Sequence, residues 1–398
     1  MKRKQTIFNK ISNKKVKIKT KIKMAIYIHI PFCRERCIYC DFTIIDVHNK
    51  TNIQIFEEYS KLVIEEIKFY SDLNTFIESK TLYLGGGTPS LIGTKNISII
   101  LEEVLKHAAK LEEITIEANP EDISEEFSKS LRKLGITRVS LGIQSMVDKN
   151  LKTLSRQNTY QTNIRAIKTL QDNNITNINC DIIFDIPDST DEELIFTLEN
   201  IVKLNVPHIS AYGLTVEKFT PLNLFVNRGT IKQKDNFEKE FLLIHNFLEE
   251  NGFIHYEISN YAKPNFESKH NLAYWKRKQY IGLGISACGF INNIRYQNEL
   301  NINKYKDKIK RGEKPISFYE EIDTTKKIEE IVMLGFRLRE GFTINEINKI
   351  GKNIESFLKK AKHFENEELL KIETESIVPT LKGWILSDYV IQQLISVF

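Results

Sequence analysis

Residues 27–42 read YIHIPFCRERCIYCDF. This run places Cys33, Cys37 and Cys40 at a C-x3-C-x2-C spacing directly after an apolar strand. The chain has five cysteines, so three within one short run indicate a single site. Three thiolates can hold three corners of an iron–sulfur cluster, because cysteine is the usual ligand of such clusters. Without a fourth cysteine nearby, one iron stays open for another ligand, as in catalytic zinc sites.

Two other kinds of metal site are alternatives to an iron–sulfur cluster. A structural zinc site usually has four ligands in paired cysteine or histidine sets. His29 is the nearby candidate for a fourth ligand, but it lies in the strand before Pro31 and is expected to point away from the cysteine loop. A ferredoxin cluster needs a fourth cysteine, whereas Cys180 and Cys288 are isolated and are predicted to be small buried residues. The odd number of cysteines argues against disulfides, so a reducing, cytoplasmic location is expected.

The composition, with 41% apolar and 27% charged residues, is typical of a soluble globular protein. No apolar run reaches the roughly 18 residues of a membrane span, so no integral membrane segment is expected. The net charge is +5, but residues 1–23 contain ten basic and no acidic residues, so the remaining chain carries −5. We expect 1–23 to be a disordered or artefactual basic tail, with Met24 as the true start. A tail that binds nucleic acid or anionic lipid is the functional alternative.

From residue 24 to about 230, apolar β-branched runs alternate with stretches of helical period. This alternation predicts an α/β fold with a parallel sheet covered by helices. Six strand–helix units predict an incomplete (β/α)6, TIM-like barrel, in which loops after the strands build the active site. Strands are expected at 25–30, 81–84, 114–117, 138–143, 178–184 and 208–213. Helices are expected at 53–70, 95–109, 124–134, 160–172 and 190–203.

After residue 230 the pattern changes, and we interpret 231–320 as an extension of the barrel. A helix at 234–250 and a strand near 253–258 precede an aromatic, glycine-bearing segment. Residues 321–398 are predicted to form a small helical, winged-helix-like C-terminal domain. Its expected elements are a helix from 324, helices at 354–362 and 364–372, a strand at 377–380 and a helix from 382. Because no basic stripe follows Lys382, no nucleic-acid partner is expected.

Polar groups follow the predicted strands. The second strand leads into Gly85-Gly86-Gly87-Thr88-Pro89, where consecutive glycines let a ligand approach the backbone. Glu117 ends the third strand and suits a ribose or an ammonium group, although a solvated charge is the alternative. Ser140–Ser145 and Asn179–Asp181 place polar groups in apolar strands, and such groups need an internal partner or a ligand. With Arg156 between them, these residues on successive strands favour one site.

Together these residues resemble the radical S-adenosylmethionine (SAM) superfamily, and within it the heme chaperones related to oxygen-independent coproporphyrinogen III oxidase. The resemblance runs from about residue 24 to the C-terminus and includes 256–262 (YEISNYA). It implies that Cys33, Cys37 and Cys40 ligate a [4Fe-4S] cluster whose open iron is chelated by SAM. An electron from the cluster would then cleave SAM to a 5′-deoxyadenosyl radical. Further cofactor contacts implied by the resemblance are Tyr27, Tyr39, Gly86, Gly87, Thr88, Glu117, Gln144, Arg156 and Asp181.

Two positions separate the chaperone branch from the oxidase branch. The similar oxidases have another cysteine two residues after the third ligand, where this chain has Phe42. The chaperones carry His-Asn-x-x-Tyr-Trp, which reads His270 to Trp275 here. An imidazole can bind heme iron and aromatic rings can lie on the macrocycle, although an aromatic core segment with one histidine is the alternative. Phe42 and His270 complete the predicted cofactor-binding residues, and no catalytic residue is predicted.

The resemblance therefore implies a heme chaperone that binds heme, SAM and a [4Fe-4S] cluster. It implies transfer of heme to an acceptor, with a respiratory, membrane-associated protein as one candidate. The alternative is an oxygen-independent coproporphyrinogen III oxidase, and a nucleic-acid-binding module is a third hypothesis. The chain departs from the family where Asp185 and Asp188 replace glycines, Asn158 replaces a common histidine, and Cys288-Gly289 replaces His-Ser.

Overall fold

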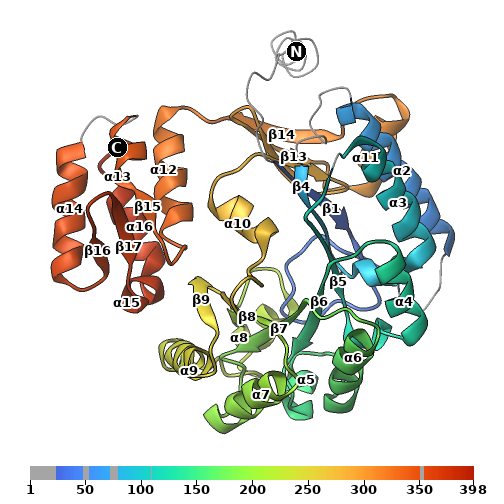
Figure 1. Cartoon of the computed structure of the whole chain (residues 1–398), viewed down its shortest axis with the longest axis horizontal. Coiled ribbons are helices and arrows are strands. Elements are labelled where there is room, and N and C mark those ends of the chain that lie inside the picture. The colour runs from blue at the N-terminus through green and yellow to red at the C-terminus, as the bar shows by residue number, and fades with distance from the viewer. Residues whose placement is uncertain (1–23, 48–52, 72–78, 109, 350–353) are drawn as a thin grey trace.

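The computed structural model describes residues 24–47, 53–71, 79–108, 110–349 and 354–398, so the predicted tail at 1–23 lies outside the described residues. A large sheet forms the centre of the molecule, with helices around it and a separate group of helices at the C-terminus (Figure 1). Within the described residues this sheet has twelve strands in the order β14-β13-β12-β11-β1-β4-β5-β6-β7-β8-β10-β9.

The six predicted strands are confirmed, and they lie side by side in chain order as parallel neighbours. Their interiors are almost entirely buried, because both faces of a parallel sheet are covered. The sheet continues past this block at both ends and does not close among the described strands, so it is an open α/β arrangement. The strands are β1 (Met24–Ile30), β4 (Ser79–Gly86), β5 (Glu113–Ala118), β6 (Arg138–Gln144), β7 (Ile178–Phe184) and β8 (His208–Gly213).

The predicted helices are also confirmed, and they pack apolar faces against the outer side of the sheet (Figure 1). Their starts follow sequence signals: Ser124 accepts a hydrogen bond from Phe127 N, and Thr190 and Glu193 form a capping box. Short helices that were not predicted, among them Asp148–Thr153 and Pro221–Asn227, fill several of the connections. The elements are α2 (Ile53–Ser71), α3 (Gly93–His107), α4 (Glu125–Lys133), α5 (Asp148–Thr153), α6 (Tyr160–Asp172), α7 (Asp191–Lys203), α8 (Pro221–Asn227), α9 (Phe237–Glu250) and, further on, α11 (Ile302–Lys310).

The segment from 254 to 321 extends the sheet at both ends. β9 (Ile254–Glu257) and β10 (Asn260–Ala262) add antiparallel strands beside β8. After α10 (Lys269–Trp275), β11 (Tyr280–Leu283) pairs in parallel with β1. The antiparallel strands β12 (Cys288–Ile291), β13 (Ile294–Asn298) and β14 (Ile316–Glu321) complete that end. The division of the chain at residues 231 and 320 stays a prediction.

The C-terminal region has its own apolar core, formed around Phe336, Phe357 and Phe364. A three-stranded sheet accompanies its helices. The predicted helix at 364–372 is wrong, because the preceding helix runs to residue 366, Glu368 has a φ of 61°, and a strand follows. The elements are α12 (Thr324–Gly335), β15 (Phe342–Thr343), α13 (Ile344–Asn348), α14 (Ile354–Asn366), β16 (Leu370–Ile372), β17 (Ser376–Pro379), α15 (Leu381–Ile385) and α16 (Ser387–Ile395).

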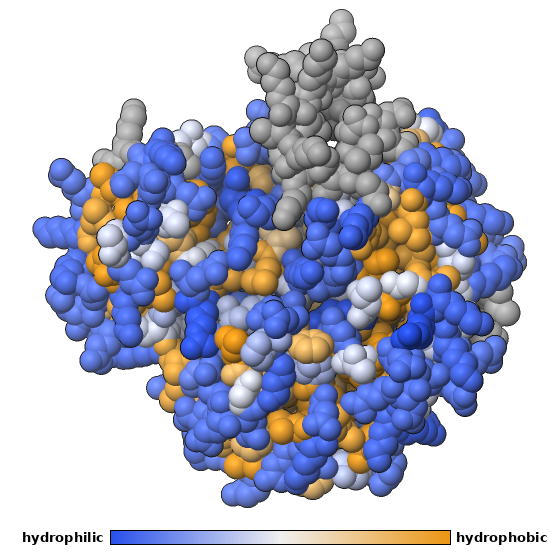
Figure 2. All heavy atoms as spheres, viewed as in Figure 1, coloured by the Kyte–Doolittle hydropathy of each residue, from blue (hydrophilic) through white to orange (hydrophobic). Residues whose placement is uncertain are grey.

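The face of the molecule in Figure 2 is mainly hydrophilic, with hydrophobic residues gathered in patches between the hydrophilic ones. None of the helices in the described ranges combines the length and the apolar character that a membrane crossing requires.

Candidate functional site

The three clustered cysteines lie on a loop whose two ends are joined by a small parallel sheet. β2 (Phe32–Cys33) pairs with β3 (Ile45–Asp46) just beyond the end of β1. Ile45 N donates a hydrogen bond of 2.6 Å to Pro31 O, which fixes the returning end of the loop. Cys37 and Cys40 lie on the loop between these strands, so all three thiols are held near the carboxyl end of β1.

Two side chains from other parts of the chain donate to the cysteine sulfurs. Thr88 Oγ1 lies 3.6 Å from Cys33 Sγ, and Arg156 Nη1 lies 3.6 Å from Cys37 Sγ. Burial raises the pKa of the Cys33 thiol to about 12. Ligation requires the thiolate, and a hydroxyl donor and a guanidinium are groups that favour it.

The donor set fits a cluster better than a single metal ion. Among the residues that the structure describes, no three His, Cys, Asp or Glu side chains converge as the ligands of one ion. A cubic cluster needs no such convergence, because each cysteine binds a different iron. Three soft sulfur donors on one loop are ligands of the type that iron–sulfur clusters take.

The glycine loop after β4 packs its backbone directly on the cysteine loop. Gly87 N donates to Ile30 O, and Thr88 N donates to Phe32 O, both at 2.8 Å. A Cβ atom on Gly87 would lie 2.7 Å from Phe32 O and 2.9 Å from Cys33 Sγ. Gly86 has a φ of 125°, a conformation that side chains disfavour. The glycines therefore allow the close contact that sets the position of Cys33.

Two buried carboxyl groups lie on β5 and β7, the two strands that flank β6 in the sheet. Glu117 accepts hydrogen bonds from Tyr83 OH at 2.8 Å and from Gly86 N at 2.9 Å. Burial, with a smaller contribution from the nearby Asp181 carboxyl, raises the pKa of Glu117 to about 7. Asp181 accepts from Ser140 Oγ at 2.9 Å, and burial raises its pKa as well. Tyr83 was missed, although its place in the strand leading to the glycine loop could have indicated it.

Arg156 joins the ends of two strands to the cysteine loop. Its Nη2 donates to Asn119 Oδ1 and to Gly142 O, both at 2.9 Å, while its Nε donates to Asn158 Oδ1 at 3.1 Å. Gln144, at the end of β6, has a φ of 63°. Asn119 was not predicted as a site residue, although it follows Glu117 by two positions in a polar strand end.

Tyr39 and Phe42 lie on the cysteine loop with different surroundings. Tyr39 packs against an apolar cluster that includes Leu154 and Leu222. Leu222 N, at the start of α8, donates to Ile38 O at 2.9 Å and so supports this part of the loop. Phe42 is 61% exposed and lines a pocket beside the loop.

His270 lies in the interior and is only 1% exposed. Its Nδ1 is 2.9 Å from Thr81 Oγ1, and its Nε2 is 2.8 Å from Tyr274 OH. Burial lowers the pKa of His270 to about 3, so the ring is neutral. Both ring nitrogens are engaged, and an iron ligand role would require the ring to leave one partner. The predicted contact between His270 and heme stays a prediction.

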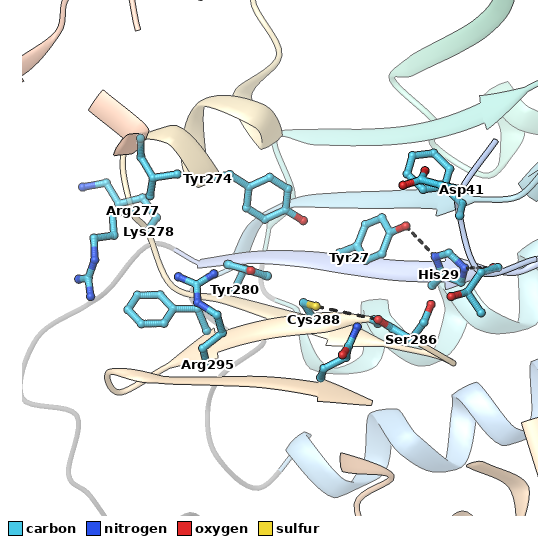
Figure 3. Close-up of a pocket in the computed structure, with 16 residues that line it drawn as sticks. Tyr27, His29, Asp41, Tyr274, Arg277, Lys278, Tyr280, Ser286, Cys288 and Arg295 are labelled. Carbon is cyan, nitrogen blue, oxygen red and sulfur yellow. Dashed lines mark hydrogen bonds between the residues drawn. The ribbon is translucent and has the colours of Figure 1, made fainter. Parts of the chain in front are cut away.

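A pocket of about 490 Å3 opens between β1, the end of α10 and the strands β11 to β13. Figure 3 shows Tyr27, Tyr274, Tyr280 and Cys288 around this opening. The prediction that Cys288 is buried is wrong, because β12 is an outlying antiparallel strand and places this residue, exposed, on the pocket wall. Cys180 is buried in the core as predicted.

The structure thus brings most predicted site residues together at one edge of the sheet. The cysteine and glycine loops, Glu117 and Arg156 are joined by direct hydrogen bonds. Tyr27 links this group to the pocket, since its hydroxyl is 2.9 Å from His29 Nδ1 and its ring lies 6.2 Å from that of Tyr83. Phe42, next to Cys40 on the loop, lines the pocket, and His270 lies behind the pocket wall, bonded to Tyr274.

Comparison with known proteins places these features in context. The sequence model of the Radical SAM superfamily matches residues 27–201, and that of the HemN C-terminal domain matches residues 322–386. The heme chaperone HemW of Lactococcus lactis subsp. lactis (strain IL1403) is 32% identical over 93% of this chain and 96% of its own. The heme chaperone HemW of Bacillus subtilis (strain 168) is 30% identical over 92% and 97%.

Among solved structures, the coproporphyrinogen III oxidase HemN from Escherichia coli, described as a radical SAM enzyme, is similar over 96% of this chain and 92% of that chain. The TM-score is 0.80 and the sequence identity is 19%. At this identity the likeness shows a shared fold, including the C-terminal helical region, and nothing more specific.

Proposed function

Because this chain belongs to the radical SAM superfamily, and within it to the family of the heme chaperone HemW proteins, we propose that it is a heme chaperone. Membership in the superfamily implies SAM and a [4Fe-4S] cluster. In the proposal, the protein binds heme and passes it to an acceptor protein. A respiratory, membrane-associated acceptor and a cytoplasmic location are parts of the same proposal.

The observation that carries the proposal over its rival is Phe42. The position two residues after Cys40 holds an exposed aromatic ring instead of the extra thiol of the similar oxidases. Phe42 also lines the pocket beside the cysteine loop, where an aromatic side chain suits a flat apolar ligand. The rival, oxidative decarboxylation of coproporphyrinogen III, stays as the alternative.

The residues at the sheet edge suit the cluster and SAM. Cys33, Cys37 and Cys40 would hold the cluster, which supplies a single electron to the sulfonium of SAM when bound. The Gly86 backbone approaches without a side chain, and the Glu117 carboxyl can accept from an ammonium or a ribose hydroxyl. These groups bind and orient the ligand, and their hydrogen bonds to one another keep the site in place before binding.

An anaerobic assay of the reconstituted full chain tests the proposal against its rival. We expect heme to bind with a shifted Soret band and to move to an apo heme protein of the respiratory type when the two are mixed. The same preparation, given reductant and SAM, is expected to leave coproporphyrinogen III unchanged. Conversion of coproporphyrinogen at catalytic rates would overturn the chaperone proposal, and so would an absence of heme binding.

A further inference from the structure

The pocket beside the cysteine loop has the walls of a site for a flat, apolar ligand. Tyr27, Tyr280 and Phe290 line it, together with Tyr274, whose ring packs edge-on against Tyr280 at 4.6 Å. Tyr274 OH is held by the buried His270, which fixes this wall. The volume of about 490 Å3 is in the range of small-molecule sites.

One end of the pocket carries an excess of positive charge. The guanidinium groups of Arg277 and Arg295 lie 4.6 and 5.4 Å from the Phe290 ring centre. Both share the single carboxylate of Glu330, at 2.6 and 2.5 Å. In the described part of the chain, Arg277 Nη2 has no hydrogen-bond partner although it is buried. Lys278 also lines the pocket.

The pocket wall also carries one acidic residue, Asp41, which lies with the cysteine loop. In Figure 3, Asp41 lies at the opposite end of the pocket from Arg277 and Lys278. With Glu330 counted against the two arginines, the arginine end keeps a net positive charge. Carboxylate groups of a ligand would therefore be bound at that end, in the bidentate manner that guanidinium groups allow.

A thiol faces the same space. Cys288 is exposed on the pocket wall, and its sulfur makes a weak contact of 4.0 Å with Ser286 O. Partial burial raises the pKa of this thiol, and Arg295 opposes the shift, so the free protein holds a neutral thiol. Cysteine sulfur is a heme ligand in several protein classes. The other candidate ligand, His270, has both ring nitrogens engaged.

We propose that this pocket holds the heme itself, with Cys288 as the iron ligand and with Arg277 and Arg295 binding the propionate carboxylates. The inference rests on the proposed chaperone function and assigns its ligand to a place. On binding ferric heme, an iron–sulfur bond forms, a water leaves the iron, the thiol proton passes to solvent, and the iron stays ferric. The exposed Phe42 and Lys278 lie on the rim, so one edge of the macrocycle would stay within reach of an acceptor.

The ligand is tested by heme titration of the cluster-loaded full chain under anaerobic conditions. The oxidised cluster is silent in electron paramagnetic resonance, so the ferric heme signal can be read directly. We expect a ferric low-spin signal typical of thiolate ligation. After the heme iron is reduced and carbon monoxide is added as a ligand, we expect the red-shifted Soret band of a thiolate-ligated heme. Cys288→Ala should abolish both signatures and weaken heme binding about tenfold or more, whereas the buried control Cys180→Ala should keep them.

The carboxylate contacts are tested with a second ligand. Arg295→Met is expected to weaken heme binding about tenfold but to leave the affinity for heme dimethyl ester unchanged, because the ester has no carboxylates to pair. A structural defect would weaken both ligands equally and would overturn the charge assignment. Arg311→Met is the matched control, since Arg311 is an exposed arginine that pairs with Glu313 away from the pocket.

The outcomes separate this inference from the function on which it rests. If the wild-type chain binds no heme, the chaperone proposal fails. If heme binds with a histidine-type spectrum that His270→Ala removes and Cys288→Ala does not change, the chaperone proposal stands and Cys288 is not the ligand. If Cys288→Ala alone removes the thiolate signature, the pocket assignment is supported.

Discussion

Arg156 Nη1 lies 3.6 Å from Cys37 Sγ, while Nη2 of the same guanidinium donates to Asn119 Oδ1 and Gly142 O. One side chain thus joins the cysteine loop to the ends of β5 and β6. Although burial opposes it, the neighbouring Tyr39 and Cys37 raise the pKa of Arg156, so its charge is permanent. The relationship makes Arg156 a positioning residue for the loop and the cation beside one sulfur.

Arg156→Met should weaken retention of the cluster and lower its reduction potential. The substitution removes a hydrogen bond to a ligand sulfur and a positive charge that stabilises added negative charge. Changes to residues that support metal ligands typically cost about 10–100-fold in metal affinity. Iron and sulfide analysis during challenge with a chelator, followed by potentiometric titration, measures both effects.

The control for this change is Arg132→Met, which removes an exposed arginine that donates to Asn174 O at 2.9 Å, away from the thiols. It should leave both the iron content and the potential unchanged. If Arg156→Met and Arg132→Met retain the same iron content and have the same reduction potential, Arg156 does not act on the cysteine loop.

Replacing Cys33, Cys37 or Cys40 singly with alanine should remove most of the iron and sulfide from the reconstituted chain. Each thiol would bind a different iron, so the loss of one leaves a cluster with two protein ligands. Anaerobic reconstitution followed by iron and sulfide determination checks this expectation. Cys180→Ala, in the buried core, should retain the metal content, and a zinc-containing wild-type preparation would contradict the prediction.

The sequence predicted the central strands and the three-thiol loop well, because both depend on local pattern. Fully buried parallel strands are continuous apolar runs, and the cysteine spacing is confined to one loop. The strands β11 to β14 were missed, since they mix polar and aromatic residues and are set by pairing with distant segments. The burial of Cys288 was predicted wrongly for the same reason, because β12 lies at an outlying part of the sheet.

Gly87→Ala should displace the cysteine loop. An added Cβ would lie 2.7 Å from Phe32 O and 2.9 Å from Cys33 Sγ, and backbone atoms cannot yield cheaply. Overpacking of this kind costs about 1–3 kcal/mol of stability. Urea unfolding of the apo chain measures this cost, and cluster content measures the displacement of Cys33.

Gly142→Ala provides the comparison for Gly87→Ala. A Cβ atom there would meet the ends of the Gln144 and Arg156 side chains at 3.1 and 3.2 Å, and side-chain ends can move. Its effect on stability should be clearly smaller. If the two variants unfold at the same urea concentration, the close approach of the two loops does not limit substitution at Gly87.

The apo chain should lose stability as the pH rises from about 4.5 to about 7, partly because of Glu117. Burial raises the pKa of Glu117 to about 7 from an ordinary value of 4.5. In this window the folded state holds a proton that the unfolded chain has released, so rising pH favours unfolding. Glu117→Gln removes the titrating carboxyl group. The decrease in the free energy of unfolding over this pH range should therefore be smaller in the variant, by an amount on the order of 1–3 kcal/mol.

Urea unfolding of the apo chain at pH 5 and at pH 8 measures the difference. The buried Glu66 and Glu257 have pKa values raised by burial to about 7 as well, so part of the pH dependence should persist in Glu117→Gln. A variant whose stability changes with pH as steeply as that of the wild type would show that Glu117 titrates normally.

The polar network of the site could be predicted only in part. Glu117, Arg156 and Asp181 were predicted as members of one site from their places at or between the ends of predicted strands, and the family resemblance added their roles as cofactor contacts. Tyr83 and Asn119 were missed, although they donate to Glu117 and accept from Arg156 respectively. Their roles depend on which strands are neighbours, and that information exists only in the folded sheet.

Asp188→Gly should leave the protein more stable than Asp185→Gly, by about 1 kcal/mol or more. Both aspartates replace family glycines and keep the left-handed conformation, with φ values of 59° and 60°, which costs side-chain-bearing residues roughly 1–2 kcal/mol. Glycine relieves this strain at both positions. At Asp185 a contact offsets the strain, because its carboxylate accepts a hydrogen bond of 3.0 Å from Asn236 N near the start of α9, and no side-chain hydrogen bond of Asp188 is seen among the described residues. Urea unfolding of both variants measures the difference, and equal midpoints would show that the Asp185 contact contributes nothing to stability.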